Sequence, residues 1–325
     1  MTPSVRSRLW ASATSFALGF GIGNYGVLMI ARPDQWLWIA VAVVLMATGA
    51  AGVLFADTSR TVSFWAILGV ELFTVLTIVP LLWTFTVATT PAGTTPRTVL
   101  PQDVSWAAFD GAISSDLLRS AAGTSLLVAL LATLVAVPLA VPAAYALVRL
   151  PVRGRRVVYG FVVATLLMPV LALAGPWADQ LIDLGAYGSR AALVVPTLVV
   201  TLPLATWLCV TVMRDAPWTL LDAVRADGAT RTQVLRQFAV PHLAPGVVAV
   251  ALLVFVAACN DFALGAGLAP DRPGLPLPAT LLVASRELDG SSAVAAAGLL
   301  WLLLPLALLL VLPRRINHLL GRSYR

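Results

Sequence analysis

Residues 214–245 read RDAPWTLLDAVRADGATRTQVLRQFAVPHLAP and form a long polar passage between two long apolar runs. The pattern predicts two short helices joined by a tight turn. Asp215 can cap the first helix, and Pro217 suits its opening turn because that position needs no N–H donor. This helix should end at Asp227-Gly228, since glycine readily adopts the left-handed conformation that closes helices.

The second helix of this passage has its own start and stop signals. Thr230 and Gln233 have the spacing of a capping box, in which each side chain binds the backbone N–H of the other residue. Pro241 is expected to stop the helix because it has no N–H to donate. The passage is therefore either a rigid helical projection that docks onto a soluble protein or an ordinary loop between helices.

The composition identifies an integral membrane protein. The chain is 59% hydrophobic and only 11% charged, whereas about a quarter of the residues in a soluble domain are charged. The net charge of +6 would suggest nucleic-acid binding in a soluble protein, but here it follows from the placement of arginines in loops, so no nucleic-acid partner is expected. The sequence contains no lysine. Because a P-loop needs its lysine on the phosphates, any ATP-derived energy must come from a partner chain.

About eight stretches are long and apolar enough to cross a bilayer, which takes roughly 20 residues. They are 9–31, 36–56, 62–87, 121–148, 157–174, 191–213, 246–265 and 293–312. With the N-terminus inside, most arginines fall on the cytoplasmic side, as the positive-inside rule requires. The external arginines are Arg32, Arg97, Arg119, Arg190, Arg272 and Arg286. We therefore expect an all-α, polytopic transmembrane helical bundle in the cytoplasmic (inner) membrane, with both termini and residues 214–245 in the cytoplasm.

The residue types that carry catalysis or hold metals are sparse. His242 and His318 are the only histidines and are far apart, and Cys209 and Cys259 both fall in apolar stretches. A free cysteine in such a stretch behaves as a small apolar residue. We expect no catalytic centre, no metal site and no cofactor in this chain.

The passage that includes Asp222-Ala223-Val224-x-x-Asp227-Gly228-Ala229 and then Pro241 resembles the EAA motif of permease subunits in binding-protein-dependent ABC importers. That motif reads Glu-Ala-Ala-x-x-Asp-Gly-Ala and is closed by a proline at the same spacing. In this sequence Asp222 replaces the glutamate and Val224 the second alanine. The resemblance implies that the chain is coupled to an ATPase through these residues: Asp222, Ala223, Arg225, Asp227, Gly228, Ala229 and Pro241.

Further motifs resemble the MalG-like carbohydrate permeases, in the same order along the chain. They are Ala144-Tyr145-Ala146-Leu147-Val148-Arg149, Leu167-Met168-Pro169 and Asn260-Asp261-Phe262. The resemblance implies a MetI-like permease core over residues 62–320, with two extra spans in 1–61 and a cytoplasmic tail at 321–325. It also implies two ATPase subunits that bind ATP, a second permease subunit and an external solute-binding protein. Carbohydrate is the favoured cargo, and a polyamine or a metal chelate stays open.

Polar groups within the apolar stretches are candidates for a substrate path. Asn260 and Asp261 come late in the seventh stretch, Met168 and Pro169 interrupt the fifth, and Thr201 lies in the sixth. Ionisable residues at membrane depth are functional candidates by default, although packing within the bundle explains each of these residues equally well.

Two other functional classes are open. A secondary transporter driven by an ion gradient would use Glu71 and Asp261 as proton sites. A structural or assembly membrane protein would carry no substrate at all. Only the importer permease accounts for residues 214–245.

Overall fold

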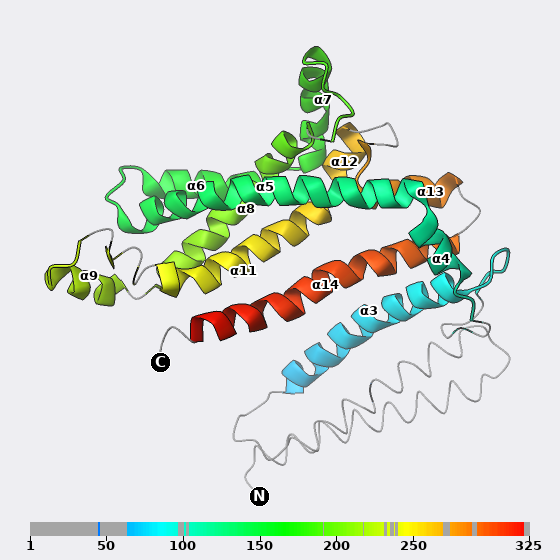
Figure 1. The fold of residues 1–325 in the computed structure, drawn as a ribbon, viewed down its shortest axis with the longest axis horizontal. Coiled ribbons are helices and arrows are strands. Elements are labelled where there is room, and N and C mark those ends of the chain that lie inside the picture. The colour runs from blue at the N-terminus through cyan, green and yellow to red at the C-terminus, as the bar shows by residue number, and fades with distance from the viewer. Residues whose placement is uncertain are drawn as a thin grey trace, which may run out of the picture. The chain divides into compact units, whose positions relative to one another are not determined.

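The computed structural model describes residues 45, 64–96, 101, 104–190, 192–216, 218–230, 233–234, 237, 240–268, 274–287 and 291–321. The regular elements in these ranges are helices, as predicted (Figure 1). The two spans expected within residues 1–61 lie outside the described part of the chain. Two compact units can be distinguished. One comprises Met1–Ile113 with Glu287–Leu299, and the other Ser114–Arg286 with Leu300–Arg325.

The first unit contains α3 (Phe64–Thr89) and α4 (Ala107–Ser114). The chain between them returns to the end of α3, where the Ser105 N–H donates to the Thr89 carbonyl at 2.7 Å. Trp106 contacts Phe85 edge-on, with ring centroids 6.4 Å apart. These contacts close the connection between α3 and α4.

The core of the second unit is formed by α5 (Asp116–Arg149), α8 (Val194–Arg214) and α11 (Val240–Cys259). Ala136, Ala140 and Ala144 recur every fourth residue on one face of α5, and each is completely buried. They pack in one cluster with Ala205 of α8. Small side chains let helix backbones approach closely, which is how helices associate where lipid offers no hydrophobic driving force.

A glycine lies at a close contact between α8 and α11. A Cβ atom added to Gly246 would lie 2.5 Å from Val212 Cγ1. The side chain of Val212 therefore occupies the space that any larger residue at position 246 would need.

The described residues contain three helices that are long and apolar enough to span a membrane, namely α5, α8 and, from His242 on, α11. A fourth candidate is broken. Residues Arg155–Leu166 form α6, and the chain then bends by 93° into η1 (Val170–Leu173) and α7 (Ala174–Asp183). The predicted interruption at Pro169 is confirmed, because this proline cannot donate an N–H and restricts the residue before it; that 157–174 crosses the membrane as one span stays a prediction. The total of eight spans stays a prediction.

The stretch 246–265 is also interrupted. Helix α11 ends at Cys259, and α12 (Ala263–Leu268) follows after a short link. Asn260 and Asp261 thus lie in a break between two helices and not inside a span. Helix α12 lies beside α7 (Figure 1), and an added Cβ on Gly267 would be 2.6 Å from Ala174 Cβ.

The remaining described helices are α9 (Trp218–Ala226), α13 (Leu277–Glu287) and α14 (Ser291–Gly321). Helix α9 lies beyond the end of α5 at which Arg149 is found (Figure 1). This position brings the polar passage of the sequence against the end of the longest described helix.

Candidate functional site

The polar passage begins with a reversal of the chain after α8. The indole Nε1–H of Trp218 donates to the Met213 carbonyl at 2.7 Å, and the Trp218 N–H donates to the Ala216 carbonyl at 2.8 Å. Asp215 closes α8 as its C-cap residue, and α9 begins only at Trp218. The prediction that Asp215 caps α9 stays a prediction, because Pro217, expected in the opening turn of that helix, lies outside the described residues.

A Schellman motif ends α9 at the predicted glycine. Gly228 has φ +94°, in the left-handed region. The Ala229 N–H donates to the Val224 carbonyl at 3.3 Å, and the Gly228 N–H donates to the Arg225 carbonyl at 3.1 Å. These are the two hydrogen bonds that define the motif. They satisfy carbonyl groups that the end of a helix would otherwise leave open.

The predicted capping box is confirmed. The Gln233 N–H donates to Thr230 Oγ1 at 3.3 Å, and the Thr230 N–H donates to Gln233 Oε1 at 2.8 Å. The reciprocal pair fixes the direction in which the chain leaves the turn at Gly228.

A small apolar cluster lies beneath this turn. Leu221 and Val234, on either side of it in sequence, are 4% and 8% exposed. Val224, Ala229 and the side chain of Leu243 in α11 pack around them. Together, the Schellman motif, the capping box and this cluster make residues 218–230 with 233–234 a folded unit, which we call the coupling segment after the role predicted for it from the sequence.

One ion pair connects the coupling segment to α5. The Nη2 group of Arg149, the last residue of α5, donates to both carboxylate oxygens of Asp222. The Arg149 guanidinium also lies over the ring of Trp218, 5.4 Å from its centroid. Tyr145, one turn earlier on α5, contacts the same ring at 5.9 Å.

The seven residues predicted to couple the chain to an ATPase have different environments. Ala223, Arg225, Asp227 and Gly228 are exposed, and Ala229 is half-buried. Asp222 is half exposed and bound by Arg149. The backbone of Pro241 is in the first turn of α11, where proline is tolerated. The predicted end of the second helix before it falls partly on residues outside the described ranges.

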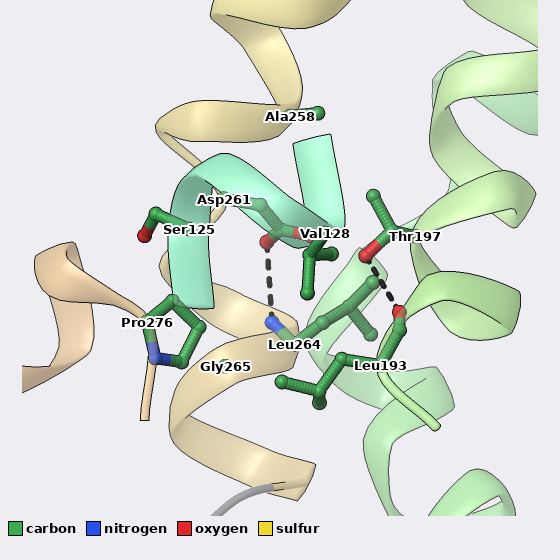
Figure 2. Close-up of a pocket in the computed structure, with 9 residues that line it drawn as sticks. All are labelled: Ser125, Val128, Leu193, Thr197, Ala258, Asp261, Leu264, Gly265 and Pro276. Atoms are coloured by element: carbon green, nitrogen blue, oxygen red, sulfur yellow. Dashed lines mark hydrogen bonds between the residues drawn. The ribbon is translucent and has the colours of Figure 1, made fainter. Parts of the chain in front are cut away.

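A second polar site is a small cavity within the second unit (Figure 2). Its walls come from α5, the start of α8, the end of α11 and the break after it, α12 and the residue before α13. The lining residues are Ser125, Val128, Leu193, Thr197, Ala258, Asp261, Leu264, Gly265 and Pro276. The cavity volume of about 10 Å³ has room for about one water molecule, so this arrangement does not hold a solute the size of a sugar.

The polar groups around the cavity already have partners. Asp261 Oδ1 accepts from the Leu264 N–H at 3.2 Å and so caps α12. Ser125 Oγ accepts from the Leu277 N–H at 2.8 Å, and Thr197 Oγ1 donates to the Leu193 carbonyl at 2.8 Å. Figure 2 shows the carboxylate of Asp261 directed at the first turn of α12.

Of the predicted path residues, Asp261 alone lines this cavity. Asn260 is exposed and donates from Nδ2 to the Val256 carbonyl at 2.8 Å. Met168 and Pro169 are exposed at the bend after α6. Thr201 is buried, and its hydroxyl donates to the Thr197 carbonyl of its own helix at 2.9 Å. The structure does not bring these residues together in one site.

Some functional candidates lie beyond what the structure describes. Glu71 is in α3, but its side chain is outside the described set. Within the described residues, no group of three or more His, Cys, Asp or Glu side chains could hold a metal ion.

Sequence reasoning missed Arg149 and Trp218 as parts of the site. Arg149 was visible only as the end of a motif, and Trp218 only as one of the chain's 10 tryptophans. Arg149 and Asp222 are 73 positions apart in the sequence. No local sequence pattern predicts a contact over such a separation.

Comparisons with known proteins point in one direction. The model of the family described as "binding-protein-dependent transport system inner membrane component" matches residues 136–325. The trehalose transport system permease protein SugB of Mycobacterium tuberculosis is 30% identical over 262 residues, which cover 79% of this chain and 95% of that protein. The sulfoquinovosyl glycerol transport system permease protein SmoH of Agrobacterium fabrum is 30% identical over 236 residues, 72% of this chain and 83% of that protein.

The fold is similar to that of a chain in a solved structure. The crystal structure of a bacterial ABC transporter involved in the import of the acidic polysaccharide alginate matches with a TM-score of 0.58 and 19% sequence identity. The match covers 79% of this chain and 98% of that chain. At this identity the likeness concerns the helical fold alone.

Proposed function

We propose that this chain, which belongs to the binding-protein-dependent transport system inner membrane component family, is a membrane-spanning subunit of an ATP-driven importer. A multi-pass permease of the inner membrane is the function that family membership supports. The chain would carry the solute across the membrane, and the energy would come from ATP hydrolysed on partner subunits.

The observation that carries this proposal is the coupling segment. It is a folded unit with both helix ends capped at its central turn, and its exposed side carries Arg225 and Asp227. The distribution of arginines favours a cytoplasmic position for it. We propose that this exposed side docks into a groove on an ABC ATPase. ATP-driven closure of the ATPases would then move α9 and switch the helices between inward and outward access.

We propose a carbohydrate as the cargo. The relatives with names include permeases of a trehalose system and of a sulfoquinovosyl glycerol system, and both names denote carbohydrate-type solutes. An external binding protein would deliver the solute to the loops around residues 89–116 and 268–292, and a second permease subunit would form the other half of the path. The cavity at Asp261 would have to widen for a sugar to pass.

The proposal is tested on the complex as it exists in the membrane. The tagged chain, purified in mild detergent from its host, should bring down an ABC ATPase and a second permease, identified by mass spectrometry. Reconstituted with the binding protein, the complex should take up labelled trehalose only when ATP is supplied inside the vesicles. Binding assays with other sugars, a polyamine and a metal chelate then define the solute class.

The outcome that would replace the proposal is uptake without ATP that stops when an ionophore collapses ion gradients. In that case Asp261→Asn should abolish uptake, because a proton site needs a titratable group. The importer predicts that Asp261→Asn keeps ATP-driven uptake, since the amide oxygen can still accept from the Leu264 N–H.

A further inference from the structure

The contact between α5 and α9 is centred on the guanidinium group of Arg149. On α9, Trp218 and Asp222 are four residues apart, which places them on the same side of the helix. Arg149 contacts both of them, the ring with its cationic face and the carboxylate with Nη2. A single side chain of α5 therefore holds two successive turns of α9.

The α5 side of the contact has the same spacing. Tyr145 and Arg149 are also four residues apart, and both meet Trp218. The indole is held from a third direction by its hydrogen bond to the Met213 carbonyl at the end of α8. These four side chains, Tyr145, Arg149, Trp218 and Asp222, form what we call the α5–α9 latch.

The latch joins α9 to the rigid part of the second unit. Its α5 end continues into the buried alanine face that includes Ala140 and Ala144. The neighbouring end of α8 is held in a similar way, because the guanidinium of Arg214 lies over the Tyr159 ring of α6 at 5.0 Å. Helix α9 is thus attached to α5 and α8 by side chains as well as by the chain itself.

The latch also determines what Asp222 can do. Both of its carboxylate oxygens accept from Arg149, and charge-assisted bonds of this kind are among the stronger ones in proteins. A cation on another protein would have to displace Arg149 and leave it without its carboxylate. Arg225 and Asp227, by contrast, are exposed and form no ion pair within the described part of the chain.

We propose that Asp222 is a positioning residue, paired with Arg149 inside this chain, and that the latch makes α5 and α9 move as one body when the coupling segment is displaced. This inference rests on the proposed function for its role in transport, and on the structure alone for the pairing. Contact with the ATPase is left to the exposed side that carries Arg225 and Asp227.

The test exchanges the two charges. The single variants Arg149→Asp and Asp222→Arg place like charges opposite each other, and the double variant restores an opposite pair with its order reversed. Arg153→Asp is the matched control, because Arg153 is an exposed arginine just beyond α5 with no part in the latch. These four variants and the unaltered chain are purified in lipid nanodiscs without partner subunits and compared by amide hydrogen exchange.

We expect exchange at residues 219–226 to accelerate about tenfold in each single variant, the scale of one lost charge-assisted bond. The double variant should return to within about threefold of the unaltered chain, and Arg153→Asp should leave α9 unchanged. Exchange at α9 that is the same in all five chains would overturn the latch, whether or not the chain transports anything.

A second readout concerns the role of Asp222 in transport. In the reconstituted importer, ATP-driven uptake should fall in each single variant and recover in the double variant. If Asp222 contacts the ATPase instead, the double variant stays as impaired as Asp222→Arg and loses ATPase co-purification, which would overturn the assignment. Absence of ATP-driven uptake in the unaltered complex would refute the proposed function, and the exchange data would still decide the pairing.

Discussion

Replacing Gly228 tests the shape of the coupling segment through backbone conformation alone. At φ +94° the residue adopts a left-handed conformation, which costs an L-residue about 1–2 kcal/mol. A Cβ atom added there meets no atom within 4 Å beyond its chain neighbours, so clash with the surrounding structure contributes nothing to the effect. Gly228→Ala should therefore destabilise the turn by about 1–2 kcal/mol, an increase of roughly 5- to 30-fold in the population that has opened locally.

Release of the strain would not avoid this cost. If the alanine leaves the left-handed region, the two Schellman hydrogen bonds from Gly228 and Ala229 are lost. A typical hydrogen bond contributes about 1 kcal/mol net, so the loss is of the same size as the strain. Gly228→Asn should fall between glycine and alanine, because asparagine tolerates the left-handed region better than other residues do.

The assay is hydrogen exchange at residues 221–226 together with ATP-driven uptake by the complex. The matched control is Gly123→Ala, at a helical glycine of α5 that also has no atoms within 4 Å of an added Cβ. The control should leave the stability of α5 unchanged or raise it slightly, because alanine in a helix is about 1 kcal/mol more favourable than glycine. Equal exchange and uptake in Gly228→Ala, Gly228→Asn and the unaltered chain would refute the reasoning.

Two further sites give sharp expectations. At Gly265, an added Cβ would lie 2.6 Å from Pro276 Cγ, and since a proline ring yields little, Gly265→Ala should destabilise the unit by about 1–3 kcal/mol. Thermal unfolding should show a lower midpoint than for Gly175→Ala, where nothing lies within 4 Å, and equal midpoints would contradict the close packing of α12. In the capping box, Thr230→Ala should cost about 0.5–2 kcal/mol. Gln233→Ala removes the other bond of the box, which its side chain accepts from the Thr230 N–H, and should cost about 1 kcal/mol by itself. A double-mutant cycle should show a coupling between the two changes, because Thr230 Oγ1 also donates to Gln233 Oε1 at 2.9 Å; no cost for Gln233→Ala would argue against the reciprocal bonds.

Local features of the coupling segment could be predicted from the sequence. The left-handed turn at Gly228 and the pair between Thr230 and Gln233 each depend on residues within a few positions of one another. Such features follow from backbone geometry and side-chain reach, so they survive in any tertiary context that leaves the segment folded.

The breaks in the apolar stretches were harder to locate. Pro169 marked the first break, because proline disrupts a helix by its own chemistry. The link at Asn260 and Asp261 was placed inside a span, since apolar residues continue on both sides of it. The structure shows that the helix ends before Asp261, whose carboxylate caps the next helix.

The tertiary contacts could not be predicted at all. The pairing of Arg149 with Asp222 and the bond from the Leu277 N–H to Ser125 Oγ join residues 73 and 152 positions apart. Their formation depends on how α5 packs, and hydropathy indicates only that α5 is apolar. The shorter carboxylate at position 222 is consistent with a partner in the same chain, but its identity required the structure.

The length of α5 can be compared with the thickness of a lipid bilayer. A helix of 34 residues extends about 50 Å at a rise of 1.5 Å per residue, whereas a bilayer measures about 40–45 Å including its headgroups. Even with an ordinary tilt, α5 is therefore long enough to reach from one aqueous phase to the other. Arg149 is the last residue of this helix, so when α5 crosses the bilayer the latch belongs at one of the two membrane surfaces, where reagents that do not enter lipid can probe it.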